Sequence, residues 1–265
     1  MSHHQFSHRQ HALWTRSFIA ATALATAWVP SAFAQDTQRN EEGARWSAGI
    51  GAVVLDQPYR DFDREIFPLP IISYESKWIS ATVPVLDFKF FSTENLSLRA
   101  RVRLSGDGYN ADDSPFMTGM DDRSRSLWAG GALIWKTELA NLSAEVLADT
   151  MGNSKGARAK VQIDRRFSAG KFGFTPRLAA EWVDDKFVDY YYGVRQSEAL
   201  AGRPFYEGTA TTNIQFGLRM DYLPSRHHAM FIDLGATRVG STIEDSPLVD
   251  KTTSTTIALG YAYRF

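Results

Sequence analysis

The chain carries a two-residue alternation of apolar and polar side chains over long segments, and this pattern restricts its fold most. Residues 255–265 place Thr, Ile, Leu, Tyr, Tyr and Phe on one face and Thr, Ala, Gly, Ala and Arg on the other. Residues 96–105 alternate Leu, Leu, Ala, Val and Leu with Ser, Arg, Arg, Arg and Ser. Since a period of two puts neighbouring side chains on opposite faces of a β-strand, the pattern predicts an all-β fold.

The length of the alternating segments favours a membrane barrel over a soluble sandwich. Many of them run 10 to 14 residues. A tilted strand crosses a bilayer in about 9–11 residues, whereas a strand in a soluble protein typically has about 5–6. Aromatic residues make up 13% of the chain although its mean hydropathy is −0.28, as expected when only every second side chain faces lipid. We therefore predict a closed antiparallel outer-membrane β-barrel.

The links between the segments alternate in length, and this orients the barrel. Outer-membrane barrels have short periplasmic turns and longer outer loops. With residue 265 at the periplasmic end, the short links from residue 92 onward all face the periplasm, and they lie at residues 92–95, 139–140, 169–170 and 223–226. The longer links then face outward, at residues 106–124, 151–155, 185–206 and 239–251.

The number of strands requires one segment to be divided. The alternation marks eleven candidate strands, at residues 45–55, 66–75, 78–91, 95–105, 125–138, 141–150, 156–168, 171–184, 207–222, 227–238 and 252–265. A bacterial barrel with both termini in the periplasm needs an even number. Within residues 78–91, Pro84 has no N–H for the ladder and can separate two short strands. We expect twelve strands; ten would result if an N-terminal segment did not span the membrane.

The N-terminus has the pattern of an export signal. Residues 1–34 combine two arginines and no acidic residue with an apolar stretch at residues 17–29, Pro30 and a terminal Ala-Phe-Ala, which is typical of a cleaved secretory signal peptide. Residues 35–43 follow as a polar periplasmic lead and residues 44–265 as the barrel. We expect the protein in the cell outer membrane, with membrane lipid and lipopolysaccharide as partners.

The charge balance and the lack of cysteine exclude several kinds of function. Without the signal the chain has 27 Lys and Arg against 30 Asp and Glu, a net charge of −3. This balance gives no sign of the clustered basic face that a nucleic-acid partner requires. No cysteine is present, which removes disulfides, thiol chemistry and cysteine–zinc sites.

The lumen-facing positions carry charges of both signs. They include Arg99, Arg101, Arg103, Lys160, Asp164, Arg166, Arg177, Glu181, Arg219, Asp221 and Asp233. A selective pore uses rings of one sign, so we expect these charges to pair across the lumen and fill it. A narrow pore is the alternative.

The sequence offers no convincing catalytic or metal-binding set. After the signal only His227 and His228 remain, next to a periplasmic turn and without a serine and acid at a suitable spacing. The acidic residues of the outer loops could meet hard cations, but none has the spacing of a calcium loop. We therefore expect no enzyme activity, no cofactor and no metal site.

Six segments, in order along the barrel, resemble the MipA/OmpV family, the group of MltA-interacting proteins. They are GAVVLDQPYRDFD (51–63), FPLPIISY (67–74), GMDDRS (119–124), DYYYGV (189–194), DSPLVDK (245–251) and GYAYRF (260–265). Three of them place candidate site residues in the outer loops: Asp121, Asp122, Arg123, Tyr190, Tyr191, Tyr192, Asp245, Ser246 and Pro247. In the last one we interpret Gly260, Tyr263 and Phe265 as a barrel-assembly signal.

The resemblance implies a non-enzymatic outer-membrane scaffold that links a murein lytic transglycosylase to a bifunctional penicillin-binding synthase. Peptidoglycan enzymes work in the periplasm, whereas three of the motifs fall in outer loops. The motifs could therefore serve turn structure or an outside ligand. Two alternatives stay open: a small outer-membrane channel, suggested by the charged lumen, and an outward-facing ligand-binding or adhesion barrel, suggested by the aromatic loop 187–206.

Overall fold

The computed structural model describes residues 44–265. The expected signal peptide and polar lead lie outside the described residues. Within this part of the chain, no helix is long and apolar enough to cross a membrane.

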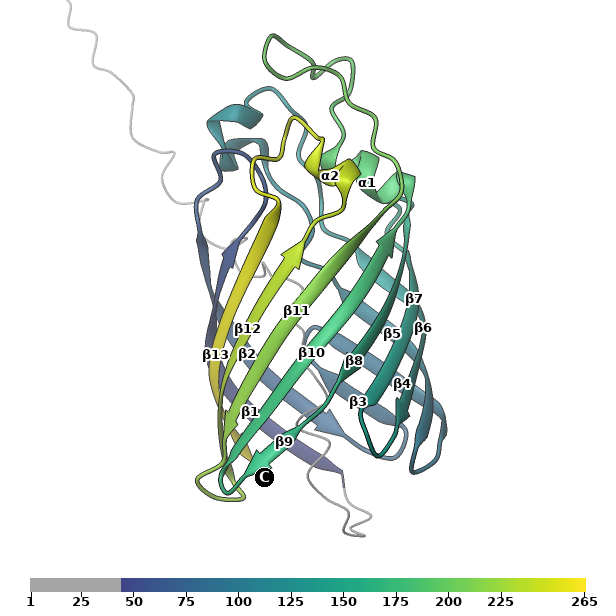
Figure 1. Cartoon of the computed structure of the whole chain (residues 1–265), viewed down its shortest axis with the longest axis vertical. Helices are drawn as coiled ribbons and strands as arrows, with labels where there is room; N and C mark the ends of the chain where they lie inside the picture. Colours follow the sequence, from purple (N-terminus) through teal and green to yellow (C-terminus); the bar gives the residue numbers. More distant parts are fainter. Residues whose placement is uncertain (1–43) are drawn as a thin grey trace, which may run out of the picture.

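The described residues form a closed antiparallel β-barrel (Figure 1). Its strands are β1 (Arg45–Asp56), β2 (Glu65–Glu75), β3 (Ile79–Thr82), β4 (Val85–Ser92), β5 (Leu96–Leu104), β6 (Leu127–Lys136), β7 (Asn141–Asp149), β8 (Ala157–Asp164), β9 (Phe167–Ala169), β10 (Phe172–Val183), β11 (Thr211–Tyr222), β12 (His228–Arg238) and β13 (Thr253–Arg264). Each strand pairs with the next, except that β8 pairs with β10 instead of β9, and β13 closes the ring on β1. β8 and β9 both pair with β10 and act as one wall strand, interrupted at Arg165 and Arg166. The barrel therefore has twelve strands, as expected from the sequence.

The segment at residues 78–91 is divided where the sequence indicated. β3 pairs with β4 from Ile79 opposite Phe88 to Thr82 opposite Val85, so Val83 and Pro84 form a tight turn. Pro84 has no N–H to donate, and the chain reverses there instead of crossing the membrane as one strand.

Alternation along each strand separates a lipid face from a lumen face. Outward side chains such as Ile50, Val161 and Phe216 are exposed apolar residues, as expected for a surface that lipid covers. Inward neighbours are buried. Near the periplasmic ends of the strands, aromatic pairs such as Trp46 with Tyr74 face outward, their ring centroids 4.4 Å apart.

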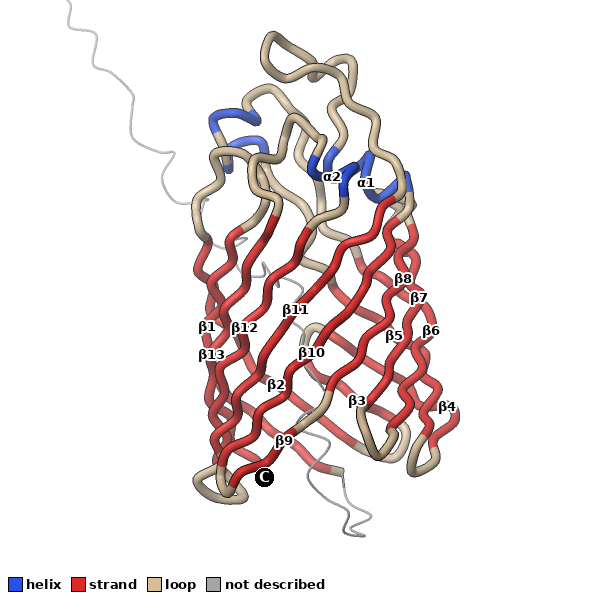
Figure 2. Tube along the Cα trace, in the orientation of Figure 1, coloured by secondary structure: helices blue, strands red, loops and turns tan. Residues whose placement is uncertain are grey.

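The two ends of the barrel differ. The C-terminus and the short turns lie at one end, whereas the long connections gather at the other (Figure 2). These connections contain two 3₁₀ turns (Ala111–Asp113 and Pro115–Met117) and the helices α1 (Asp185–Tyr192) and α2 (Ser241–Glu244). By the loop-length rule of outer-membrane barrels, the loop-rich end is the outer one.

Candidate functional site

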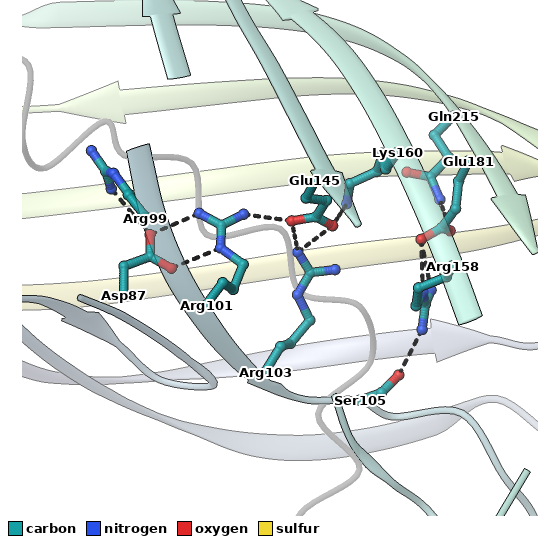
Figure 3. A network of polar contacts seen from close by, with 10 residues as sticks. All are labelled: Asp87, Arg99, Arg101, Arg103, Ser105, Glu145, Arg158, Lys160, Glu181 and Gln215. Carbon is teal, nitrogen blue, oxygen red and sulfur yellow. Dashed lines mark hydrogen bonds and ion pairs between the residues drawn. The ribbon is translucent and has the colours of Figure 1, made fainter. Parts of the chain in front are cut away.

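A network of buried charges runs along the inner wall of the barrel and starts on β5 (Figure 3). Alternation places Arg99, Arg101 and Arg103 on the inner face of this strand. Asp87 of β4 accepts a hydrogen bond from Arg99 Nη1 at 3.1 Å and two from Arg101, at 2.7 and 2.8 Å. Such paired guanidinium–carboxylate contacts hold both groups in a fixed orientation.

Glu145 of β7 is the centre of this network. It accepts hydrogen bonds from Arg101 Nη1 at 2.5 Å and from Arg103 Nη2 at 2.5 and 2.6 Å. Lys160 Nζ of β8 lies 3.4 Å from its Oε1. One buried carboxylate therefore holds three cations from two strands.

A second group continues the network toward β10 and β11. Arg158 donates to Glu181 at 2.7 and 3.0 Å and to Asp107 at 2.7 Å. Gln215 Nε2 donates to the other oxygen of Glu181 at 2.8 Å. Arg158 thus joins the wall to Asp107, the start of an outer loop.

A third group lies between β10, β11 and β12. Arg177 forms an ion pair with Asp233, Arg219 Nε donates to Asp221 at 2.8 Å, and Arg166 Nη1 donates to Asp221 at 2.6 Å. Gly217 of β11 makes room for this group, because a Cβ there would lie 2.4 Å from Nε of Arg177.

The predicted lumen residues lie on the inner face, but the structure groups them unevenly. Asp164 accepts hydrogen bonds from Asn141 and Gln162 instead of pairing with a cation. Three central residues of the network were not among the predicted ones: the acidic Asp87 and Glu145 and the cation Arg158. All three have the lumen-facing parity of their strands: Asp87 stands between Leu86 and Phe88, and Glu145 between Ala144 and Val146. Parity could therefore have found them.

The ion pairs within the wall join strands that are neighbours or two apart in the ring, as Arg101 of β5 and Glu145 of β7 are, so the charges pair along the inner wall and not across the lumen as expected. Shared carboxylates hold more than one cation, which offsets part of the cost of removing these groups from water. Among residues 44–265, no group of His, Cys, Asp and Glu side chains could hold a metal ion.

An apolar plug closes the outer mouth of the barrel. Trp128 and Val183 point inward near the outer ends of β6 and β10 and are fully buried. Helix α1 lies over them, because Phe187, Val188 and Tyr191 belong to the same buried cluster. The side chain of Asp184 caps this helix by accepting the N–H of Phe187 at 2.9 Å, which is a common stabilising arrangement at helix starts.

Arg123 joins the outer loops above this plug. Its guanidinium donates to Glu198 at 2.8 Å, to the carbonyl of Tyr190 at 2.7 Å and to the carbonyl of Asp121 at 2.8 Å. Its Cζ also lies 5.8 Å from the ring centroid of Tyr109. The loops at residues 105–126 and 184–210 are thereby joined into one unit, which we call the outer cap together with the loops at residues 57–64 and 239–252.

The other predicted loop residues are mostly used within the outer cap. Tyr190 and Tyr191 bond to the backbone of Ser124, and Tyr192 stacks on Tyr59 with centroids 5.3 Å apart. Ser246 is buried and donates to the carbonyl of Tyr192 at 2.6 Å.

The three predicted aspartates of the outer cap are all exposed, but they differ in their contacts. Asp122 accepts the N–H of Ala111 at 2.8 Å, and Asp121 pairs with Arg195 near the surface. Asp245 is exposed, and Pro247, two residues further on, is half-buried. Most of the motif side chains thus hold the cap together, and Asp121, Asp122 and Asp245 are exposed to solvent.

We predict that the outer cap loosens in acid. Burial alone would raise the pKa of the Glu198 carboxyl, but the hydrogen bonds from Arg123 and from the backbone of Asp121 and Arg195 lower this pKa from 4.5 to about 2. A carboxyl with a depressed pKa stabilises the fold above its unfolded pKa, and this contribution is lost as the pH falls toward the folded value. Amide hydrogen exchange of residues 190–206 should therefore accelerate between about pH 4.5 and about pH 2.

The Glu198→Gln variant is the control for this prediction. Its cap amides should exchange faster already at neutral pH and should lose the acid-dependent step in this window. A wild-type cap whose exchange shows no step beyond the intrinsic pH dependence of amide exchange would contradict the assignment.

The C-terminal strand places the three predicted assembly residues on both faces. Tyr263 and Phe265 point outward, with their rings in edge contact at 5.2 Å. Gly260 faces the lumen, where a Cβ would lie 2.5 Å from Ile71 Cδ1. Their role in assembly stays a prediction. The two histidines lie at the periplasmic rim, where His227 Nδ1 contacts the carbonyl of Arg264 at 2.9 Å and His228 Nδ1 the hydroxyl of Tyr261 at 2.7 Å.

Comparison with known proteins gives a family match over nearly the whole barrel. The family described as MltA-interacting protein MipA matches residues 48–265. The chain is 27% identical over 231 residues to the MltA-interacting protein of Escherichia coli (strain K12), covering 83% of this chain and 90% of that protein. It is 25% identical over 258 residues to the outer membrane protein OmpV of Vibrio cholerae, covering 95% and 97%.

Among solved structures, the chain is similar to a loop-deletion mutant of OmpT, an outer membrane protein of Vibrio cholerae. The TM-score is 0.37 at 6% identity, and the similarity covers 84% of this chain and 99% of that one.

Proposed function

The chain belongs to the MipA family of outer-membrane β-barrels, and from this premise we propose that it is a non-enzymatic scaffold for cell-wall growth. It would bring a murein lytic transglycosylase together with a bifunctional penicillin-binding synthase. The family match over residues 48–265 carries this proposal, since a relative with the same coverage is named for an interaction with MltA.

The partner surface is expected at the periplasmic end. The enzymes to be bound act on peptidoglycan, which lies on that side of the outer membrane. At the outer end most motif residues are occupied by contacts within the outer cap. The periplasmic turns are short, and one of them presents Leu139 with 75% of its surface exposed. An exposed leucine at a turn tip, next to the charged Glu138, suits the apolar centre and polar rim of a protein contact.

A pull-down with a purified lytic transglycosylase tests the proposal. The Leu139→Asp variant, alone and combined with deletion of residues 35–43, should retain the barrel but capture about tenfold less enzyme, which is the loss expected when a central apolar contact of about 1.4 kcal/mol is removed. The penicillin-binding synthase is tested in the same way.

The matched control places the same substitution at the other end of the barrel. Leu200 lies in the outer cap and is 53% exposed, so Leu200→Asp should leave capture unchanged. The scaffold does not use this face if the Leu139→Asp variants capture as much enzyme as the wild type, and if variants with all the periplasmic turns swapped do so too. If the wild-type barrel captures neither enzyme, the scaffold role is wrong.

We also predict that the protein does not conduct ions. Glu145 and Glu181 hold cations on the inner wall, and Phe187 and Tyr191 belong to the apolar plug at the outer mouth of the lumen. Planar-bilayer recordings of the folded wild-type protein should show no conductance steps. Regular steps from well-folded protein would favour the channel alternative instead.

A further inference from the structure

The barrel wall has a gap above the β3–β4 hairpin. β2 pairs with β1 from Glu65 to Glu75, but with β3 only along Ser73–Glu75. The hairpin turns back at Val83 and Pro84. The hydrogen bond from the Val83 N–H to the carbonyl of Ile72, at 3.3 Å, marks the lower border of the gap. Within the described chain, residues 65–72 of β2 therefore have a neighbouring strand on one side only. We call this gap the lateral window (Figure 2).

The sequence of β2 suits a strand that is unpaired on this side. The carbonyl of Ile72 points toward β3, and in an antiparallel strand every second residue points its backbone groups the same way. Pro68 and Pro70 hold these positions. Proline has no N–H, and in sheets it is found at unpaired edges. Two of the donors that a missing strand would leave unpaired are thus absent from the sequence itself.

The lateral window leads into a cavity of the lumen. This cavity is lined by Pro70, which faces outward, and by the inward-facing Leu69 and Ile71, together with Thr82 and Val83 of the hairpin. These residues also border the window, so the cavity lies directly behind it.

The near side of the cavity is apolar. Leu69, Ile71, Phe231 and Ala258 belong to one buried cluster on the lumen faces of β2, β12 and β13. Phe67, Val83 and Leu104 pack against this cluster. These three side chains come from β2, the hairpin turn and the end of β5, and form the inner lips of the window. On the lipid side, Ile66 and Ile72 are 72% and 50% exposed.

The far side of the cavity is polar and rich in guanidinium groups. Arg177, Arg219, Asp233 and Gln215 line it, and Arg219 Cζ lies 3.9 Å above the ring of Phe231, where the two sides meet.

We propose that the lateral window admits a single-chain amphiphile with an anionic head, a long-chain carboxylate, from the outer leaflet into this cavity. The chain lies on Leu69, Ile71 and Phe231, and the carboxylate reaches Arg177 and Arg219. Apolar lips on a lipid-facing opening favour an acyl chain over a hydrated solute, because water is absent from the hydrocarbon region. Guanidinium groups bind carboxylates through charge-assisted hydrogen bonds.

Photo-crosslinking tests the path of the chain. A fatty acid with a diazirine near its methyl end is added to the protein in nanodiscs, and the labelled residues are mapped by mass spectrometry. Labels should concentrate on Leu69, Ile71, Val83 and Phe231. Even labelling of outward positions such as Val146 and Val161 would overturn the proposal. So would equal labelling of the window by a phospholipid with the same diazirine, since the window would then hold bulk lipid chains.

Substitution at the lip tests the window directly. Val83→Trp should reduce the affinity for the fatty acid about tenfold or more, whereas Val161→Trp, on the lipid face of β8, should not change it. Leu104→Trp repeats the test from the other lip if Val83→Trp does not fold. Unchanged affinity in both folded lip variants would overturn the proposal. Equal affinity for the methyl ester of the same acid would overturn the assignment of the head.

Discussion

Glu145→Gln is expected to be the most destabilising single substitution in the lumen. The amide has the shape of the carboxylate but no charge, so Arg101, Arg103 and Lys160 lose the carboxylate that they share. Breaking a buried ion pair by neutralising one partner costs about 3–5 kcal/mol. The variant should unfold at a clearly lower temperature, measured by the loss of heat-resistant mobility in gel electrophoresis and by circular dichroism in detergent.

Glu94→Gln is the matched control. Glu94 is exposed in the short turn between β4 and β5, and a surface charge away from special contacts changes stability by no more than about 0.5 kcal/mol. Equal melting of the Glu145 and Glu94 variants would mean that the central carboxylate does not hold the network.

Arg123→Met is expected to open the outer cap without unfolding the barrel. Methionine keeps part of the apolar stem but loses the contacts to Glu198, to the carbonyl of Tyr190 and to the ring of Tyr109. Glu198 is then a buried carboxylate that has lost its cation, again at a cost of about 3–5 kcal/mol. Protease added to the outer face of proteoliposomes should cut within residues 190–206 much faster than in the wild type, while the barrel fragment stays intact.

Arg64→Met provides the comparison. The side chain of Arg64 is 75% exposed and pairs with Asp56 at the surface, a type of contact worth about 0–1 kcal/mol. The Arg64→Met variant should be cleaved at the same rate as the wild type. If Arg123→Met is cleaved no faster than Arg64→Met, the cap is held by its apolar core instead.

The sequence predicted the barrel because one physical requirement repeats at every strand. Each wall residue faces either lipid or lumen, so the period of two is visible without knowledge of the partner strands. The strand count also followed, since Pro84 cannot take part in a central ladder. The interruption of one wall strand at Arg165 and Arg166 was harder to predict, because two adjacent charges break the alternation but do not show which strand they belong to.

The pairing within the site could not be predicted in the same way. Parity places Arg101 and Glu145 in the lumen, but which residues meet depends on the tilt and register of the closed ring. Arg123 and Glu198 are 75 residues apart and lie in loops without periodicity. Their contact follows from the folding of the outer cap, and no local sequence pattern predicts it.

The short β3–β4 hairpin also gives the wall an uneven mechanical character. A closed ring of backbone hydrogen bonds resists widening, and here the ring is complete only in the periplasmic half of the wall. In the outer half it is cut beside β2, so lateral tension in the outer leaflet acts on side-chain contacts instead of backbone bonds. Changes in circumference should therefore begin at this cut, with the periplasmic half serving as the rigid base from which the wall flexes.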